Sequence, residues 1–279
     1  MLDVALLSVI SRAIVSRLTL PRILEGGACG CVEKWRARYS ILPRETMLAV
    51  GNSRYQTKSD GQPPTRAIDA LRGPNGDPLG TIVWPELPGT GEELAALTRL
   101  FDLKPGANLF TRDDASQATV RRLQSDGSLQ HFKHIVFAAH GYLNADAPDL
   151  SAVVLSQVGL GAGEDGYLRA PELASFDFRS DLVLVSACET GVGKTVSGEG
   201  ILGLPFALQA GGNASTVLTL WQIVDGTSAE FVARFFSKVK AGAPFAAALA
   251  ETKREFIRGE AGEQGKSPAA WAAFVYYGN

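Results

Sequence analysis

The stretch DLVLVSACETGVGKT, residues 181–195, joins an apolar run to a loop punctuated by glycines. The run does not alternate between apolar and polar residues, which is typical of a strand buried on both faces of a sheet. It ends at Cys188. The loop that follows carries Gly193-Lys194-Thr195 and is similar to loops that cradle nucleotide phosphates. The stretch therefore raises two hypotheses, a thiol nucleophile at a strand end or a phosphate-binding loop.

Other segments of the chain extend the same pattern. Apolar runs occur at 47–55, 134–139, 151–156 and 215–223. Helical patterns lie between or beside them, at 89–101 with Thr90 as the expected N-cap and glutamates in the first turn, and at 170–176, 200–211 and 227–242. Buried strands separated by helices predict an α/β protein, a three-layer α/β/α sandwich with a mostly parallel central sheet. Residues 56–90 are rich in Gly, Pro and Asp and predict a long irregular excursion.

Two of the predicted strands end on residues with chemical use. His140 follows the run 134–139, and Cys188 follows the run 181–187. If these strands are neighbours, the imidazole and the thiol meet at the carboxyl edge of the sheet, where open parallel sheets bind ligands. A nucleophilic cysteine needs a nearby base. The backbone N–H groups of Gly141 and Cys188 are candidates for an oxyanion hole. His131 and His134 lie at the opposite end of their strand and are expected to be surface or packing residues.

The phosphate-loop hypothesis fails at one position. The pattern requires a glycine five residues before Gly193, and this position is Cys188. Cys29 and Cys31 form a C-x-C pair, but no second pair or histidine cluster accompanies them, as a structural zinc site would need. We therefore expect neither nucleotide nor metal, and no cofactor.

The blocks HIVFAAHGYLNADAPDLSAVVLS, DLVLVSACETGVGK, GEGILGLPFALQAGG, TVLTLWQIVDGTSAEFVARFF and WAAFVYYG resemble, in order, the blocks of the CHAT peptidases. LPGTGEELAALTRLF is similar to the helix that precedes them. These are caspase-like proteases, often accompanied by tetratricopeptide repeats. The resemblance covers residues 41–279 and implies a caspase-hemoglobinase-like fold with a dyad of His140 and Cys188. Residues 1–40 do not match and are expected to form an N-terminal extension with an amphipathic helix and a loop.

The resemblance also implies where a substrate binds. Thr219, Leu220 and Trp221 resemble the strand against which caspase-like enzymes lay the substrate backbone, with Trp221 as a pocket wall or, alternatively, a core aromatic. Asp225 is a candidate for the first specificity pocket, or an N-cap for the helix that begins near residue 227. Acidic residues that follow His140 are weaker candidates for recognising a basic side chain, and a solvated acidic loop is the alternative. They are Asp146, Asp149, Glu164 and Asp165.

Composition excludes several classes of protein. The formal net charge is −2, which does not favour direct binding to nucleic acid. Three cysteines are too few to staple a chain of 279 residues, so a reducing cytoplasm is expected. The apolar N-terminus is interrupted by Arg12 and Arg17, which argues against a membrane span. A docking or packing helix is favoured, and a membrane-surface segment is the alternative.

These observations favour a cysteine endopeptidase that cleaves a protein substrate, under the control of a partner protein or a signal. A bacterial setting and a role in signalling or defence are implied by the resemblance alone. The alternative is a catalytically silent caspase-like scaffold for protein–protein interaction.

Overall fold

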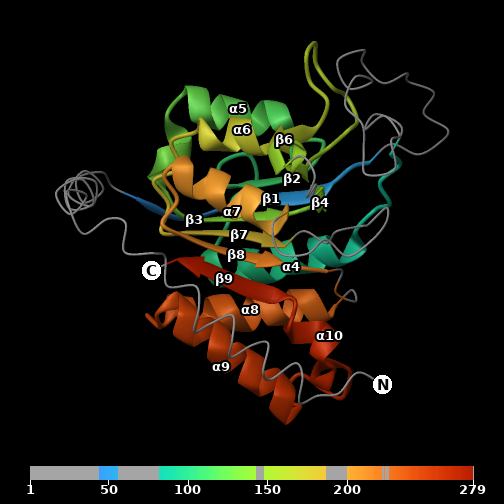
Figure 1. Ribbon diagram of the computed structural model, residues 1–279, viewed down its shortest axis with the longest axis vertical. Coiled ribbons are helices and arrows are strands. Elements are labelled where there is room, and N and C mark those ends of the chain that lie inside the picture. The colour runs from blue at the N-terminus through green and yellow to red at the C-terminus, as the bar shows by residue number, and fades with distance from the viewer. Residues whose placement is uncertain are drawn as a thin grey trace. The chain divides into compact units, whose positions relative to one another are not determined.

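A six-stranded sheet forms the centre of this computed structural model, which describes residues 44–55, 82–142, 148–186, 200–221, 223 and 226–278 (Figure 1). The strand order is β2-β1-β3-β7-β8-β9, with β9 antiparallel to its neighbour and the other strands parallel. The strands are β1 (Glu45–Ser53), β2 (Leu109–Arg112), β3 (Phe132–Ala138), β7 (Leu182–Ser186), β8 (Ser215–Thr219) and β9 (Phe274–Gly278). The mostly parallel sheet predicted from the apolar runs is confirmed.

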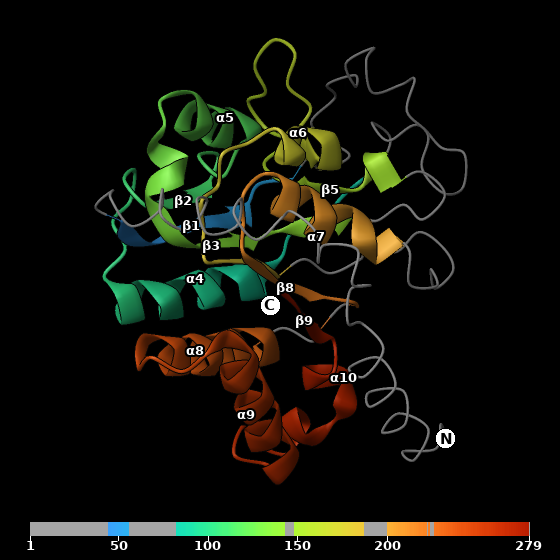
Figure 2. The same ribbon diagram turned by 60° about the vertical axis from the view of Figure 1, so that its left-hand side comes forward.

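Helices cover both faces of this sheet (Figures 1 and 2). On one face lie α5 (Gln117–Ser125), α6 (Ala170–Ala174) and α7 (Gly200–Ala210). On the other lie α4 (Pro88–Phe101) and α8 (Thr227–Lys240), with α9 (Phe245–Arg258) and the short α10 (Pro268–Trp271) packed beyond α8. Alternate strand residues enter two separate apolar cores, as Val183 and Val185 face the α5–α7 side and Leu182 and Leu184 face the α4–α8 side. The three-layer α/β/α sandwich is confirmed.

A second, smaller sheet continues directly from β3. It is antiparallel, in the order β4-β5-β6, and consists of β4 (His140–Tyr142), β5 (Ala152–Val154) and β6 (Tyr167–Arg169). The expectation that the apolar run 151–156 joins the parallel sheet is wrong, because this run supplies β5. An apolar run reports burial on both faces and does not specify which sheet provides that burial.

The start of α4 differs from the sequence-based expectation. The N-cap is Leu87, with no side-chain capping bond, and Pro88 begins the helix. Thr90 therefore lies inside the first turn, and its Oγ1 donates to the carbonyl of Leu87 at 2.6 Å. Because the helix begins earlier than expected, Glu93 falls in the second turn, where it is buried with 1% of its surface exposed. Proline at the first helical position lacks only an N–H that would have no partner inside the helix.

The carboxyl ends of the central strands approach one another closely at one rung. Gly51 of β1 pairs with Ala138 of β3, which pairs with Ser186 of β7. A Cβ at Gly51 would lie 2.2 Å from the carbonyl oxygen of Ala138, so only glycine allows this spacing.

Several sequence-based expectations lie outside the described residues. They concern the N-terminal helix, the Cys29–Cys31 pair, most of the excursion at 56–90 and the loop that begins at residue 187. The division of the chain into 1–40 and 41–279 stays a prediction. Among the helices that are described, none is long and apolar enough to cross a membrane.

Candidate functional site

The two strands expected to carry the dyad are adjacent. β3 and β7 run parallel, and their last rung pairs Ala138 with Ser186. His140 lies two residues after Ala138, at the first residue of β4, where the chain passes from the central sheet to the smaller one. Cys188 lies two residues after Ser186 in the sequence and is outside the described residues. The condition that the two strands are neighbours is therefore met, whereas the distance between thiol and imidazole stays a prediction.

The imidazole of His140 is fully buried and held by a backbone carbonyl. Its Nε2 lies 2.6 Å from the carbonyl oxygen of Pro85. Because a carbonyl oxygen can only accept, Nε2 carries the proton, and in the neutral ring Nδ1 is the basic nitrogen. Burial lowers the pKa of His140 to about 4, although the Pro85 bond opposes this shift. At neutral pH the ring is therefore an uncharged base.

Two aromatic side chains enclose this imidazole. The ring centroid of Tyr55 lies 4.7 Å and that of Trp84 lies 4.9 Å from the centroid of His140. The Tyr55 hydroxyl accepts from the backbone N–H of His140 at 3.1 Å and donates to the carbonyl of Val154 at 3.0 Å. His140 and Val154 are partners in the β4–β5 ladder. The Tyr55 hydroxyl thus bridges the two strands at this pair and fixes the backbone of His140.

The segment that presents the Pro85 carbonyl is itself anchored at both sides. The indole Nε1 of Trp84 donates to the Tyr167 hydroxyl at 2.8 Å. The Glu86 carboxylate accepts from the backbone N–H of Tyr55 at 3.2 Å and from Nη1 of Arg112 at 3.0 Å. Sequence reasoning did not find Tyr55, Trp84 or Pro85, because they contact His140 only through the fold and belong to no motif around it.

The pairing of β5 with its two neighbours shows to which side the Gly141 N–H points. The N–H of Leu155 donates to Gly166, on the β6 side of β5, so Val153 also directs its polar groups toward β6. Gly141 is the partner of Val153 on the other side of β5. Because Val153 directs its polar groups toward β6, Gly141 and Val153 form a non-hydrogen-bonded pair in the β4–β5 ladder. Its N–H points away from β5. The oxyanion role itself stays a prediction.

The expected substrate-binding residues divide into buried and exposed positions. Thr219 is buried and pairs with Phe274 of β9, and the N–H of Leu220 donates to the carbonyl of Ala273 at 3.0 Å. Trp221 is 37% exposed, and its Nε1 donates to the carbonyl of Ala269 at 3.1 Å. The alternative of a core aromatic at Trp221 is therefore wrong.

The acidic candidates are partly engaged within their own loops. Asp165 forms an ion pair with Arg169 at 2.5 Å, and Glu164 accepts from the N–H of Gly161 at 2.9 Å. Asp149 is exposed, whereas Asp146 and Asp225 lie outside the described residues. The N-cap of α8 is Gly226, so the alternative that Asp225 is the N-cap of this helix is wrong.

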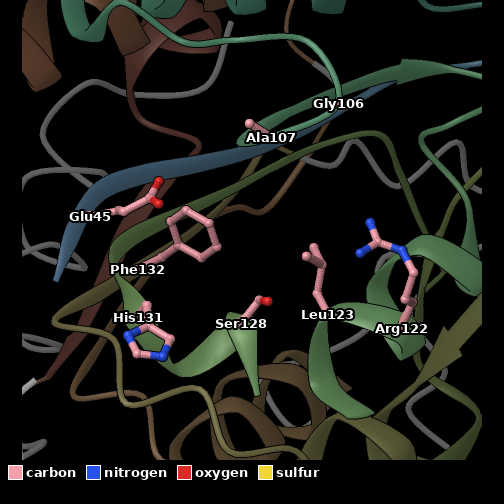
Figure 3. A pocket seen from close by; sticks show the side chains of 8 residues that line it. All are labelled: Glu45, Gly106, Ala107, Arg122, Leu123, Ser128, His131 and Phe132. Atoms are coloured by element: carbon pink, nitrogen blue, oxygen red, sulfur yellow. The ribbon is translucent and has the colours of Figure 1, made fainter. Parts of the chain in front are cut away.

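The other end of the sheet carries the remaining histidines. His134 is packed among Phe101, Phe236 and Phe245, and burial lowers its pKa to about 4. His131 lines a cavity of about 280 Å³ at the beginnings of β1 and β3 (Figure 3). The cavity is lined by Glu45, Gly106, Ala107, Arg122, Leu123, Ser128, His131 and Phe132. The described residues contain no group of three or more His, Cys, Asp or Glu side chains that could hold a metal ion.

Comparison with known proteins gives one family and a distant structural likeness. A profile of the CHAT domain matches residues 32–279, which confirms the resemblance indicated by the motifs. Chains in the crystal structures of the Saccharomyces cerevisiae separase–securin complex at 2.6 and 3.0 Å resolution are 14% and 16% identical, with TM-scores of 0.46 and 0.43. Each match covers 89% of this chain and 13% of the other. No curated protein matches the sequence significantly.

Proposed function

Because this chain belongs to the CHAT domain family, we propose that it is a cysteine endopeptidase that cleaves a protein substrate with a dyad of Cys188 and His140. The observation that carries the proposal is the imidazole of His140, which is buried, uncharged and fixed by Pro85 at the carboxyl edge of the sheet. A general base must be held in one tautomer to accept a proton at a defined atom. The Pro85 carbonyl accepts the Nε2–H bond and so leaves Nδ1 as the nitrogen that accepts the proton.

The register of the sheet supports the pairing. Ala138 and Ser186 are direct partners, and each precedes its proposed catalytic residue by two positions. Cys188 is only two peptide units from Ser186, a stretch that spans at most about 7 Å, and this supports the proposal that the thiol lies beside His140.

The reaction follows from these positions. Nδ1 of His140 takes the proton of the Cys188 thiol as the sulfur attacks the scissile carbonyl carbon, and the resulting imidazolium is stabilised by its Nε2–H bond to Pro85. Backbone N–H groups of Gly141 and Cys188 hold the oxyanion. The imidazolium then protonates the leaving amine as the C–N bond breaks, which leaves a thioester. Nδ1 next deprotonates a water molecule that attacks the thioester, and the released thiolate regains the proton.

Substrate binding is proposed at the end of β8. The peptide would pair in extended form with the chain near Thr219, Leu220 and Trp221. The Leu220 N–H is already used by Ala273, so the main-chain bonds to substrate would come from the other groups of this segment. The half-exposed indole of Trp221 would form a pocket wall, and Asp225 would contribute to the first specificity pocket. Control by a partner protein is part of the proposal, since a protease acting on cell proteins needs restraint.

The test is cleavage of a fluorogenic peptide library and of candidate partner proteins by the wild-type protein. We expect cleavage that disappears in Cys188→Ala and in His140→Ala, and that persists in the matched control Cys29→Ala/Cys31→Ala. Cleavage that survives in Cys188→Ala would rule out the dyad. A wild-type protein that cleaves nothing, and whose Cys188 reacts with alkylating reagents no faster than Cys29, would favour the silent scaffold.

A further inference from the structure

Glu93 is a buried carboxyl group that the proposed reaction does not use. It lies on α4 with 1% of its surface exposed, beside the apolar core residues Leu94 and Leu97. Burying a carboxyl group is unfavourable unless hydrogen bonds compensate for the lost water. Its partners therefore indicate what the residue does.

Those partners come from two other elements. The Glu93 Oε2 accepts from the Ser186 hydroxyl at 2.9 Å and from the Ser228 hydroxyl at 3.3 Å. The two hydroxyls lie 3.3 Å from each other, which closes a triangle of polar contacts. Ser186 is the last residue of β7, and Ser228 is in the first turn of α8. A single carboxyl group thus joins α4, β7 and α8.

The triangle lies at the rung on which the dyad depends. Ser186 pairs with Ala138, two residues before His140, and is itself two residues before Cys188. Because only two peptide units join Ser186 to Cys188, we expect a displacement of Ser186 to displace the nucleophile as well.

The second oxygen of Glu93 lacks the contacts that the first one makes. Oε1 is buried and has no hydrogen-bond partner within the part of the chain that the structure describes. A fully apolar residue at this position would avoid this cost, so the presence of a buried carboxyl group calls for an explanation other than packing.

We propose that Glu93 is a positioning residue, which holds the end of β7 against α4 and α8 and so fixes the Cys188 thiol relative to His140. This inference rests on the proposed function. A misplacement of about 1 Å at a reacting group can cost about 100-fold in rate. Loss of the hydrogen bond between Ser186 and Glu93 should therefore lower the rate of turnover.

The test compares Glu93→Ala and Glu93→Gln with Glu92→Gln, which changes the exposed neighbouring carboxylate. For Glu93→Ala we expect kcat to fall roughly 10- to 100-fold with KM changed less than about twofold. Glu93→Gln keeps an acceptor oxygen for Ser186, so its kcat should stay within about fivefold of wild type. Glu92→Gln should be indistinguishable from wild type. Unchanged kcat in a folded Glu93→Ala protein would overturn the inference.

Two further measurements keep the two proposals separable. The alkylation rate of Cys188 by iodoacetamide, followed by peptide mass spectrometry with Cys29 and Cys31 as internal references, needs no substrate. We expect it to fall about tenfold in Glu93→Ala, even if no cleavable peptide is found. If Glu93→Ala does not fold, Ser186→Ala removes one hydroxyl from the triangle and should lower kcat and alkylation two- to tenfold. Rates equal to wild type in a folded Ser186→Ala would refute the positioning role.

Discussion

At the scale of single residues, the tautomer of His140 is set by one backbone carbonyl. Pro85 is the acceptor for Nε2–H, and a proline carbonyl cannot be removed by changing a side chain. The residues that hold this arrangement can be changed instead. Tyr55 is the most accessible to a test, because one hydroxyl satisfies the N–H of His140 and the carbonyl of Val154 together.

Tyr55→Phe should lower both stability and activity. The substitution keeps the ring packed against His140 but leaves a buried N–H and a buried carbonyl without their partner, which should cost about 1–3 kcal/mol in the free energy of unfolding. Urea unfolding gives that value, and cleavage assays should show a lower kcat because the His140 backbone is released. Tyr277→Phe is the matched control, since no hydrogen bond of the Tyr277 hydroxyl occurs among the described residues. Equal losses in both variants would show that the Tyr55 bridge has no special role.

At the scale of elements, three strands meet at the rung of Gly51, Ala138 and Ser186. The rung places the ends of β3 and β7 side by side, and the proposed catalytic residues follow from these ends. The spacing between β1 and β3 depends on the missing side chain of Gly51.

Gly51→Ala should therefore displace β3 at its carboxyl end. The added Cβ would lie 2.2 Å from the Ala138 carbonyl oxygen and 2.7 Å from its Cβ, and both are parts of a packed strand that cannot move away without cost. We expect a loss of about 1–3 kcal/mol in stability and a lower kcat. Gly161→Ala is the control, because its φ is not positive and a Cβ there would meet only the flexible side chain of Glu164, at 3.3 Å. A Gly51→Ala protein as stable and active as wild type would contradict the close approach.

At the scale of the whole molecule, buried titratable groups set the pH dependence of stability. Burial raises the pKa of Glu93 from 4.5 to about 8, opposed by its bonds to Ser186 and Ser228. Burial lowers the pKa of both His134 and His140 from 6.5 to about 4. Near pH 6.5 each of these three groups is thus neutral in the folded protein.

Stability should pass through a maximum near pH 6.5. Below this value the unfolded histidines bind protons that the folded ones do not, so stability falls as the pH decreases toward 4. Glu93 is ionised above about pH 4.5 in the unfolded state but only near pH 8 in the folded state, so its contribution to stability falls throughout that range. Above pH 6.5 this fall outweighs the remaining gain from the two histidines, and the net loss by pH 8 should be about 1 kcal/mol. Urea unfolding at pH 5, 6.5 and 8 measures both slopes. Glu93→Gln should remove the alkaline slope, and an equal slope in this variant would show that another group causes it.

Much of this architecture could be predicted from the chain alone. Apolar runs of five to seven residues predicted β3 and β7, because a strand covered on both faces needs no polar residues. The same rule misplaced the run 151–156, which is buried just as fully in the smaller sheet. Thr90 looked like an N-cap because its residue type suits one, but Pro88 begins the helix earlier. Local patterns predict whether a segment is a helix or a strand better than they predict which strands it pairs with or at which residue it begins.

The sequence by itself determined the α/β class and the family, and it predicted His140 and Cys188 as the dyad. These properties depend on residue types at fixed spacing along the chain. Only the tertiary structure decided that Pro85 and Tyr55 hold His140 and that Glu93 reaches Ser186. These contacts join residues that are 55, 85 and 93 positions apart. The physical reason is that a hydrogen bond depends on distance in space, and the register of the sheet, not the order of the chain, sets that distance.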